Sequence, residues 1–168
     1  FFWDWRIVMK KLSLIELNEI NFDLVQKYID QDPNVFSGFN RLFELVGFKT
    51  FGESDYDHIE PWVHWVSVHT GKGFEEHQVF RLGDIVEFSG EQIFEKLENL
   101  GLKVGCVSPM NAENRLKHPA FFIPDPWTNT SSDGSIMSRG IHQALRQAVN
   151  DNAEGKIQPI TLMYLLGA

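Results

Sequence analysis

The chain has 168 residues, of which 43% are hydrophobic and 23% charged, a composition that suits one folded domain with a core and excludes a disordered chain. Its formal net charge of −8 argues against a nucleic-acid polymer or an anionic membrane as a general partner. Cys106 is the single cysteine, so no internal disulfide forms, and its apolar surroundings predict a core residue. No stretch approaches the roughly 18 apolar residues of a membrane span, and we expect a cytoplasmic protein.

Both ends of the chain have features unlike those of a complete domain. Residues 1–8 contain an acid and a base and no small-residue cleavage site, so they do not fit a signal peptide. We expect them to be a non-native or upstream extension. Residues 160–166 form an apolar element that stops at Gly167 with no later segment to cover it. We therefore expect residues 9–168 to be the N-terminal part of a single, truncated domain.

The first predicted elements are a strand and a helix. The short apolar run 12–17 predicts a buried strand, and the period of residues 22–29 predicts a helix with Asn21 as its N-cap. Asn18 and Glu19 directly follow the strand. Since open α/β sheets bind ligands beyond the carboxyl ends of their strands, these two residues occupy a position that is commonly functional.

A second amphipathic helix is predicted over residues 36–46, because apolar residues recur there at helical spacing. Residues 48–51 form a possible strand, and the acidic loop 53–58 leads to Glu60.

Residues 61–70 predict a helix with both ends marked, because Pro61 suits its first turn and Gly71 the position after its end. One face of this helix carries Trp62, Trp65, Val66 and His69. His64 lies about 140° around the helix from His69, so the two histidines do not face one site together. His69 shares the aromatic face and is expected in the core.

The remaining elements predict the fold class. A helix with inward-facing Ile93, Phe94, Leu97 and Leu100 ends at Gly101, an apolar strand runs to Val107, and together they form half of a βαβ unit. Residues 108–112 form the loop after this strand, 120–127 an extended segment and 135–149 a last helix. We expect an α/β fold, with a mostly parallel sheet in a three-layer α/β/α arrangement.

Two conspicuous residues each have two interpretations. His77 with Glu75 and Glu76 could hold a metal ion, but neighbouring residues cannot all converge on one ion and no zinc pattern is present, so a loop histidine that holds its turn by a hydrogen bond is favoured. Glu60 either caps the helix that follows, which composition alone favours, or belongs to an anion or metal pocket at the helix start.

Three segments resemble the alkaline phosphatase superfamily, in its type I phosphodiesterase/nucleotide pyrophosphatase and sulfatase-like branch. They are the strand and polar turn of residues 14–19, the helix end and loop of residues 68–71 and 76–79, and the run 93–107 with Ser108 and Pro109. The resemblance implies a domain that hydrolyses phosphate or sulfate esters with two metal ions, while an activated Thr, Ser or modified Cys attacks from a helix start.

By position, the resemblance puts the first metal ligand on Asn18, with Glu19 beside it, and the nucleophile on Pro61. Proline cannot be a nucleophile, and a register shift would make Glu60 the reactive or metal-binding group. We therefore expect these site residues: catalytic Glu60; substrate-binding Trp62, His64 and Asn111; and Asn18 and Glu19 as ligands of a divalent metal, Zn or Mn.

The expected function is metal-dependent hydrolysis of a small phosphate or sulfate ester by the full-length protein, with the 168-residue chain inactive on its own. The alternative is a member of the superfamily that has lost catalysis and binds a phosphorylated or sugar ligand. A third option, an unrelated nucleotide-binding domain, would place the loop of residues 108–110 at the ligand instead.

Overall fold

The computed structural model describes residues 11–48, 50, 52–151, 155–156 and 158–166. The expected extension, residues 1–8, lies outside the described residues, as do two of the four positions of the possible strand 48–51. The chain divides into two compact units, residues 1–50 and 51–168, each of which is described by itself.

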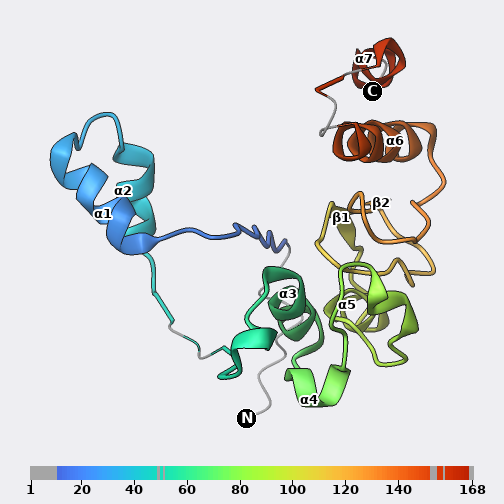
Figure 1. The fold of residues 1–168 in the computed structure, drawn as a ribbon, viewed down its shortest axis with the longest axis horizontal. Coiled ribbons are helices and arrows are strands. Elements are labelled where there is room, and N and C mark those ends of the chain that lie inside the picture. Colours follow the sequence, from blue (N-terminus) through green and yellow to red (C-terminus); the bar gives the residue numbers. More distant parts are fainter. Residues whose placement is uncertain (1–10, 49, 51, 152–154, 157, 167–168) are drawn as a thin grey trace. The chain divides into compact units, whose positions relative to one another are not determined.

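The first unit is a pair of helices, α1 (Phe22–Gln31) and α2 (Ser37–Phe43), which pack side by side (Figure 1). The predicted helix and cap are confirmed, since the Asn21 side chain accepts a hydrogen bond from the N–H of Leu24 at 2.9 Å. The second helix is shorter than the predicted 36–46.

The predicted buried strand 12–17 is wrong. The segment forms no strand, and its apolar side chains are exposed, with Ile15 76% and Leu14 59% accessible. A buried strand needs a neighbour to pair its backbone, and the described residues of this unit include no other strand. Asn18 and Glu19 lie in an exposed turn after this segment.

The first α-helix of the second unit is α3 (Pro61–Thr70), which has the predicted bounds. Pro61 occupies its first turn, and Gly71 ends it in the left-handed conformation at φ 70°. A 3₁₀ turn (Tyr56–His58) precedes α3, and the short helix α4 (Phe74–His77) and a second 3₁₀ turn (Asp84–Glu87) follow it. Val66 of α3 packs with Val79, Ile85 and Phe88 in one core cluster.

The sheet of the second unit has two strands, β1 (Gly105–Val107) and β2 (Phe121–Ile123), which run parallel with Cys106 opposite Phe122. Helix α5 (Ile93–Asn99) precedes β1, and its Phe94 meets Phe122 edge-on, with the ring centroids 6.3 Å apart. Gly105 leaves room for the Phe121 ring, because a Cβ there would lie 2.4 Å from that ring and the ring would have to move. The α/β class and the parallel pairing are thus confirmed within a mostly helical structure.

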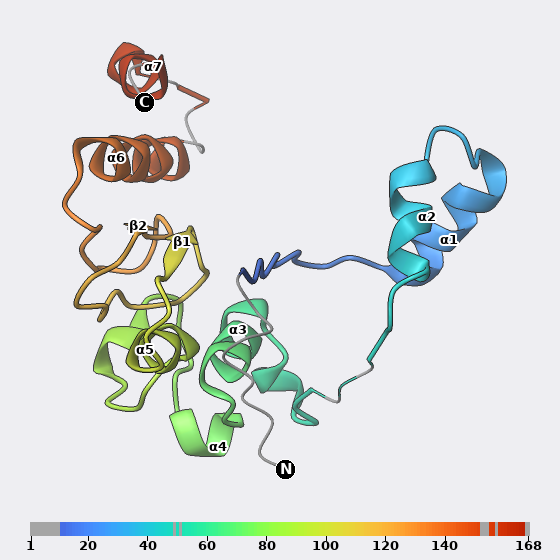
Figure 2. The same cartoon turned by 180° about the vertical axis from the view of Figure 1, so that it is seen from behind.

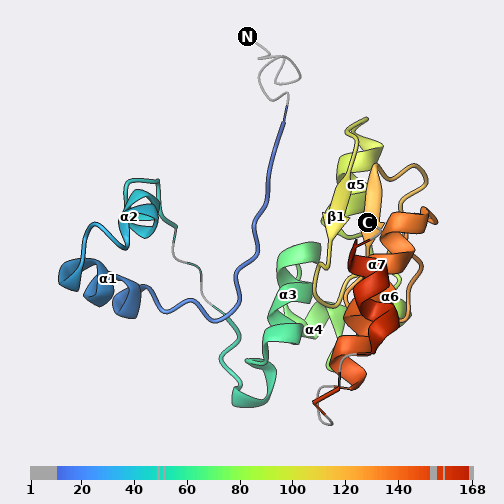
Figure 3. The ribbon, with the colours of Figure 1, turned by 90° about the horizontal axis from the view of Figure 1, so that it is seen from above.

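Two helices complete the second unit. Helix α6 (Ile136–Asn150) packs against β2, and α7 (Pro159–Leu166) packs against α6, where the Thr161 hydroxyl donates to Gln147 (Figure 3). The Ser135 hydroxyl caps α6 by accepting the N–H of Ser138 at 3.1 Å. Figure 2 shows the two strands between α5 and α6.

Asp133 fixes the start of α6 to β2. Burial disfavours its carboxylate, but hydrogen bonds from the Ser138 hydroxyl and the N–H groups of Phe122 and Ser135 outweigh this and hold the Asp133 pKa well below its ordinary value.

Candidate functional site

The first turn of α3 is open in the sense that no side chain caps it. Glu60 is the N-cap residue, but its exposed carboxylate accepts no capping hydrogen bond, so the hydrogen-bonded cap is wrong, while its favourable interaction with the helix dipole stays a prediction. The Glu60 carbonyl accepts the N–H groups of Val63 and His64 at 2.9 and 3.1 Å. Pro61 has no N–H, and among the described residues the N–H of Trp62 has no acceptor. This helix end therefore offers a backbone donor and the positive end of the helix dipole.

Asn111 ties this turn to the loop after β1. Its side-chain Nδ2 donates to the Trp62 carbonyl at 3.0 Å and to the Arg81 carbonyl at 3.2 Å, while its Oδ1 accepts the N–H of Gly83 at 2.9 Å. The residue is completely buried and has a left-handed backbone, with φ 51°. The first turn of α3 therefore lies beside the carboxyl-terminal loop of a parallel strand.

Asp125 in turn holds Asn111 from the loop after β2. Its Oδ2 accepts the N–H of Asn111 at 2.6 Å and the Thr128 hydroxyl at 2.7 Å. Its Oδ1 accepts the N–H groups of Trp127 and Thr128 at 2.8 and 2.6 Å. Asp125 and Thr128 are each 1% exposed. The loops after both strands thus meet in one buried polar network behind the start of α3.

The predicted substrate-binding residues have different surroundings. Trp62 is half-buried, and its indole N–H donates to the Phe80 carbonyl at 3.0 Å. His64 is also half-buried, with a buried Nε2 that has no hydrogen-bond partner in the described part of the chain. Asn111 lies in the interior with its amide engaged on both sides, a geometry that favours holding the site over touching a ligand.

The predicted metal ligands belong to a different unit of the chain from these residues. Asn18 and Glu19 belong to the first unit, while Glu60 belongs to the second. Among the described residues, no group of three or more His, Cys, Asp or Glu side chains is placed to hold a metal ion. The divalent metal therefore stays a prediction.

His77 holds its turn, as predicted. Its Nδ1 accepts the N–H of Val79 at 3.0 Å, so the proton of the neutral ring is on Nε2, 3.1 Å from the Ser67 hydroxyl oxygen. A ring in this tautomer donates to Ser67 and cannot remove its proton, which excludes a Ser–His catalytic pair here. Burial lowers the pKa of His77 below its ordinary value of 6.5, against the nearby charges of Glu53 and Glu76.

Replacing His77 with asparagine is expected to flatten the acid dependence of stability. The pKa of His77 is below 6.5 in the folded state, so above that pH the ring is largely neutral in both the folded and the unfolded state. As the pH falls, His77 of the unfolded state binds a proton first. The fold therefore loses stability from about pH 6.5 down to the folded-state pKa. Asparagine can still accept the Val79 N–H but does not titrate.

Urea unfolding between pH 7.5 and 5 would measure this effect. The control is His118→Asn, which removes an exposed histidine and should leave the wild-type slope unchanged. If His77→Asn keeps the full wild-type slope, His77 is not the group that titrates.

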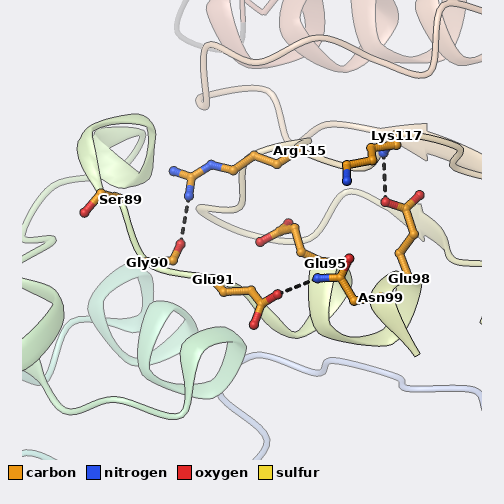
Figure 4. A pocket seen from close by; sticks show the side chains of 8 residues that line it. All are labelled: Ser89, Gly90, Glu91, Glu95, Glu98, Asn99, Arg115 and Lys117. Carbon is orange, nitrogen blue, oxygen red and sulfur yellow. Dashed lines mark hydrogen bonds between the residues drawn. The ribbon is translucent and has the colours of Figure 1, made fainter. Parts of the chain in front are cut away.

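A cavity of about 260 Å³ lies elsewhere in the second unit, between α5 and the loop that joins the two strands (Figure 4). It is lined by Ser89, Gly90, Glu91, Glu95, Glu98, Asn99, Arg115 and Lys117. The sequence did not single out this place.

The charged groups of this cavity mostly hold the fold. Glu95 accepts the N–H of Gln92 at 2.7 Å, and burial raises its pKa above the ordinary value. Glu98 accepts the N–H groups of Lys117 and His118, which lower its pKa. The Arg115 guanidinium donates to the Gly90 carbonyl at 2.8 Å. We therefore place the candidate site at the start of α3.

Sequence reasoning missed Asp125 and Thr128. The available signal was local: an Asp three residues before a Thr, with Pro126 and Trp127 between them, is typical of a side chain that folds back onto its own turn. That pattern predicts the turn but not the bond to Asn111.

The chain matches no protein-family model, no curated protein and no solved structure. The resemblance to the alkaline phosphatase superfamily therefore stays a prediction. None of the described helices combines the length and apolar character that a membrane crossing requires.

Proposed function

We propose that the open first turn of α3 binds the anionic group of a small phosphate or sulfate ester, and that the full-length protein hydrolyses such esters. One observation carries the proposal: Asn111 holds the first turn of α3 at the loop after β1, and the Trp62 N–H has no acceptor among the residues that the structure describes. Anions bind at helix starts because backbone N–H groups and the helix dipole both favour negative charge, and α/β sheets place ligands beyond the carboxyl ends of their strands.

Arg81 is a cationic residue whose backbone is tied to the same Asn111 amide, and we propose that it assists. The Asn111 side-chain amide donates to both the Arg81 carbonyl and the Trp62 carbonyl. The Arg81 side chain is exposed. The chain is acidic overall, so a local cation is needed to draw an anion to this surface.

In the proposed reaction, the Glu60 carboxylate takes a proton from water as the water oxygen bonds to phosphorus or sulfur. The ester bond then breaks, and the leaving oxygen departs with the bonding electrons. A carboxylate in this role needs access to solvent and freedom from other partners, and Glu60 has an exposed side chain that does not cap the helix.

The same chain supports one alternative function, a protein that binds the ester without turnover. Pro61 favours it, because proline has no hydroxyl or thiol at the position where the resemblance puts a nucleophile. Under either function we propose a three-layer α/β/α domain of the alkaline phosphatase superfamily, which the position of the two strands between α5 and α6 supports.

Inorganic phosphate should stabilise the chain against heat in proportion to its binding. At ten times the dissociation constant, the gain is about 1.4 kcal/mol, measurable as a rise in melting temperature and by calorimetric titration. Sulfate should compete for the same site, and Arg81→Ala should weaken both anions by about fivefold through the loss of one exposed charge.

The matched control is Arg139→Ala, which removes the same charge from α6 and should leave phosphate binding unchanged. Phosphate that binds neither the chain nor its full-length form would overturn the proposed site. Equal weakening by both arginine variants would also overturn it, because net charge alone would then explain the binding.

A further inference from the structure

We infer that Asp125 is a positioning residue for the open first turn of α3 and acts through Asn111, an inference that rests on the proposed function. The Asp125 carboxylate makes no hydrogen bond to α3 among the described residues. It accepts the N–H of Asn111 at 2.6 Å, and the Asn111 side chain reaches the Trp62 carbonyl. The carboxylate thereby fixes the backbone from which the contact to α3 is made.

The residue type at position 111 fits this task closely. The contact needs a donor toward two carbonyls and an acceptor toward the Gly83 N–H, and an amide side chain has both. The backbone at φ 51° is one that asparagine adopts more readily than other residues with a side chain. Aspartate would tolerate this backbone but would place a carboxylate oxygen against the two carbonyls.

The residue type at position 125 fits equally well. All four recorded bonds of its carboxylate are acceptances, two on each oxygen, from Asn111, Trp127 and Thr128. A buried carboxylate is stable only when such donors surround it. An asparagine there would turn one acceptor into a donor that faces N–H groups, so Asp125→Asn should release the loop of Asn111.

These contacts fix the geometry of the first turn of α3 before a ligand binds. The first turn of a helix frays unless something outside the helix holds it. Here the Trp62 carbonyl, one residue after Pro61, is held by an amide that is itself held by a buried carboxylate. The Trp62 N–H is thereby kept in a fixed direction before any anion arrives, which lowers the ordering cost of binding.

Three variants test the inference. Asn111→Gly keeps the left-handed backbone free of strain and removes only the side-chain contacts. Asn111→Asp keeps the acceptor for the Gly83 N–H but replaces the donor to the two carbonyls with an acceptor. Asp125→Asn removes the acceptor that holds the Asn111 N–H. The readouts are hydrogen exchange at the amides of Val63 and His64, which bond to the Glu60 carbonyl, and calorimetric titration with inorganic phosphate. The control is Val104→Ala, a core truncation that lowers stability away from this network.

We expect all three variants to speed exchange at the amides of Val63 and His64 by about tenfold and to weaken phosphate binding by about five- to tenfold, with Asn111→Asp the most affected. Val104→Ala should do neither at temperatures where it remains folded. Variants that match Val104→Ala in both readouts would overturn the inference, because the network would then be merely structural.

The inference and the proposed function can fail separately. If the wild-type chain binds no phosphate, the proposed function fails, and the exchange rates of Val63 and His64 alone decide whether Asp125 and Asn111 hold the turn. If phosphate binds but Asn111→Gly leaves both its affinity and those exchange rates at wild-type values, the site stands and the positioning role falls.

Discussion

Substituting Glu60 with glutamine is expected to slow ester turnover by about 10²- to 10⁴-fold while tightening the binding of inorganic phosphate by about threefold. The two effects have opposite signs because the carboxylate weakens the binding of phosphate but assists the proposed reaction. It repels a bound anion, and in the proposed reaction it takes the proton of the attacking water. Hydrolysis of 4-nitrophenyl phosphate and 4-nitrophenyl sulfate by the full-length protein would measure turnover, and calorimetric titration would measure binding.

Glu75→Gln is the matched control, since Glu75 is also an exposed glutamate in the first turn of a helix, α4. It should change neither quantity. Full turnover in Glu60→Gln would remove Glu60 from the chemistry, and unchanged phosphate affinity would place the anion away from the start of α3. Tighter phosphate binding without any turnover in the wild-type protein would favour the binding function over the hydrolase.

Truncating Arg115 to alanine is expected to lower the free energy of unfolding by about 3–5 kcal/mol. The guanidinium donates to Glu113 at 2.5 Å and to three carbonyls in the stretch before α5, those of Ile85, Phe88 and Gly90. Its loss would leave these acceptors without their donor in a partly buried place. Urea unfolding followed by circular dichroism would give the difference.

Two further variants make the Arg115 result specific. Lysine cannot reproduce the planar set of donors, so Arg115→Lys should recover less than half of the lost stability. Lys117→Ala removes an exposed cation from the same cavity and should change stability by no more than about 0.5 kcal/mol. An Arg115→Lys protein as stable as wild type would show that charge alone matters there.

The helices could be predicted where residues at or beside their ends determine those ends. Pro61 is the first residue of α3 and Gly71 directly follows its last residue, so the predicted bounds are the observed ones. Asn21 and Ser135 cap their helices through bonds that span three residues. The role of His77 followed in the same way, because its acceptor atom serves an N–H only two residues away.

The rest depends on contacts that no local pattern encodes. Residues 12–17 have the composition of a buried strand, but burial requires a partner strand, and composition cannot supply one. Asn111 was predicted to bind the substrate, which stays a prediction; its bond to Trp62 spans 49 residues, so its buried position could not be read from its loop. Asp125 reaches Asn111 across 14 residues and was missed for the same reason.

The 49-residue span between Asn111 and Trp62 also sets an order of folding events for the two ends of α3. The carboxyl-terminal end closes at Gly71 through a bond to Ser67, four residues away, so it forms with the helix itself. The amino-terminal end needs α5, β1 and the following loop in place first, because a long loop must close before its contact stabilises anything. The end of α3 proposed to bind the ester is therefore the last part of that helix to mature, and chains caught early in folding would carry a formed α3 that cannot yet hold a ligand.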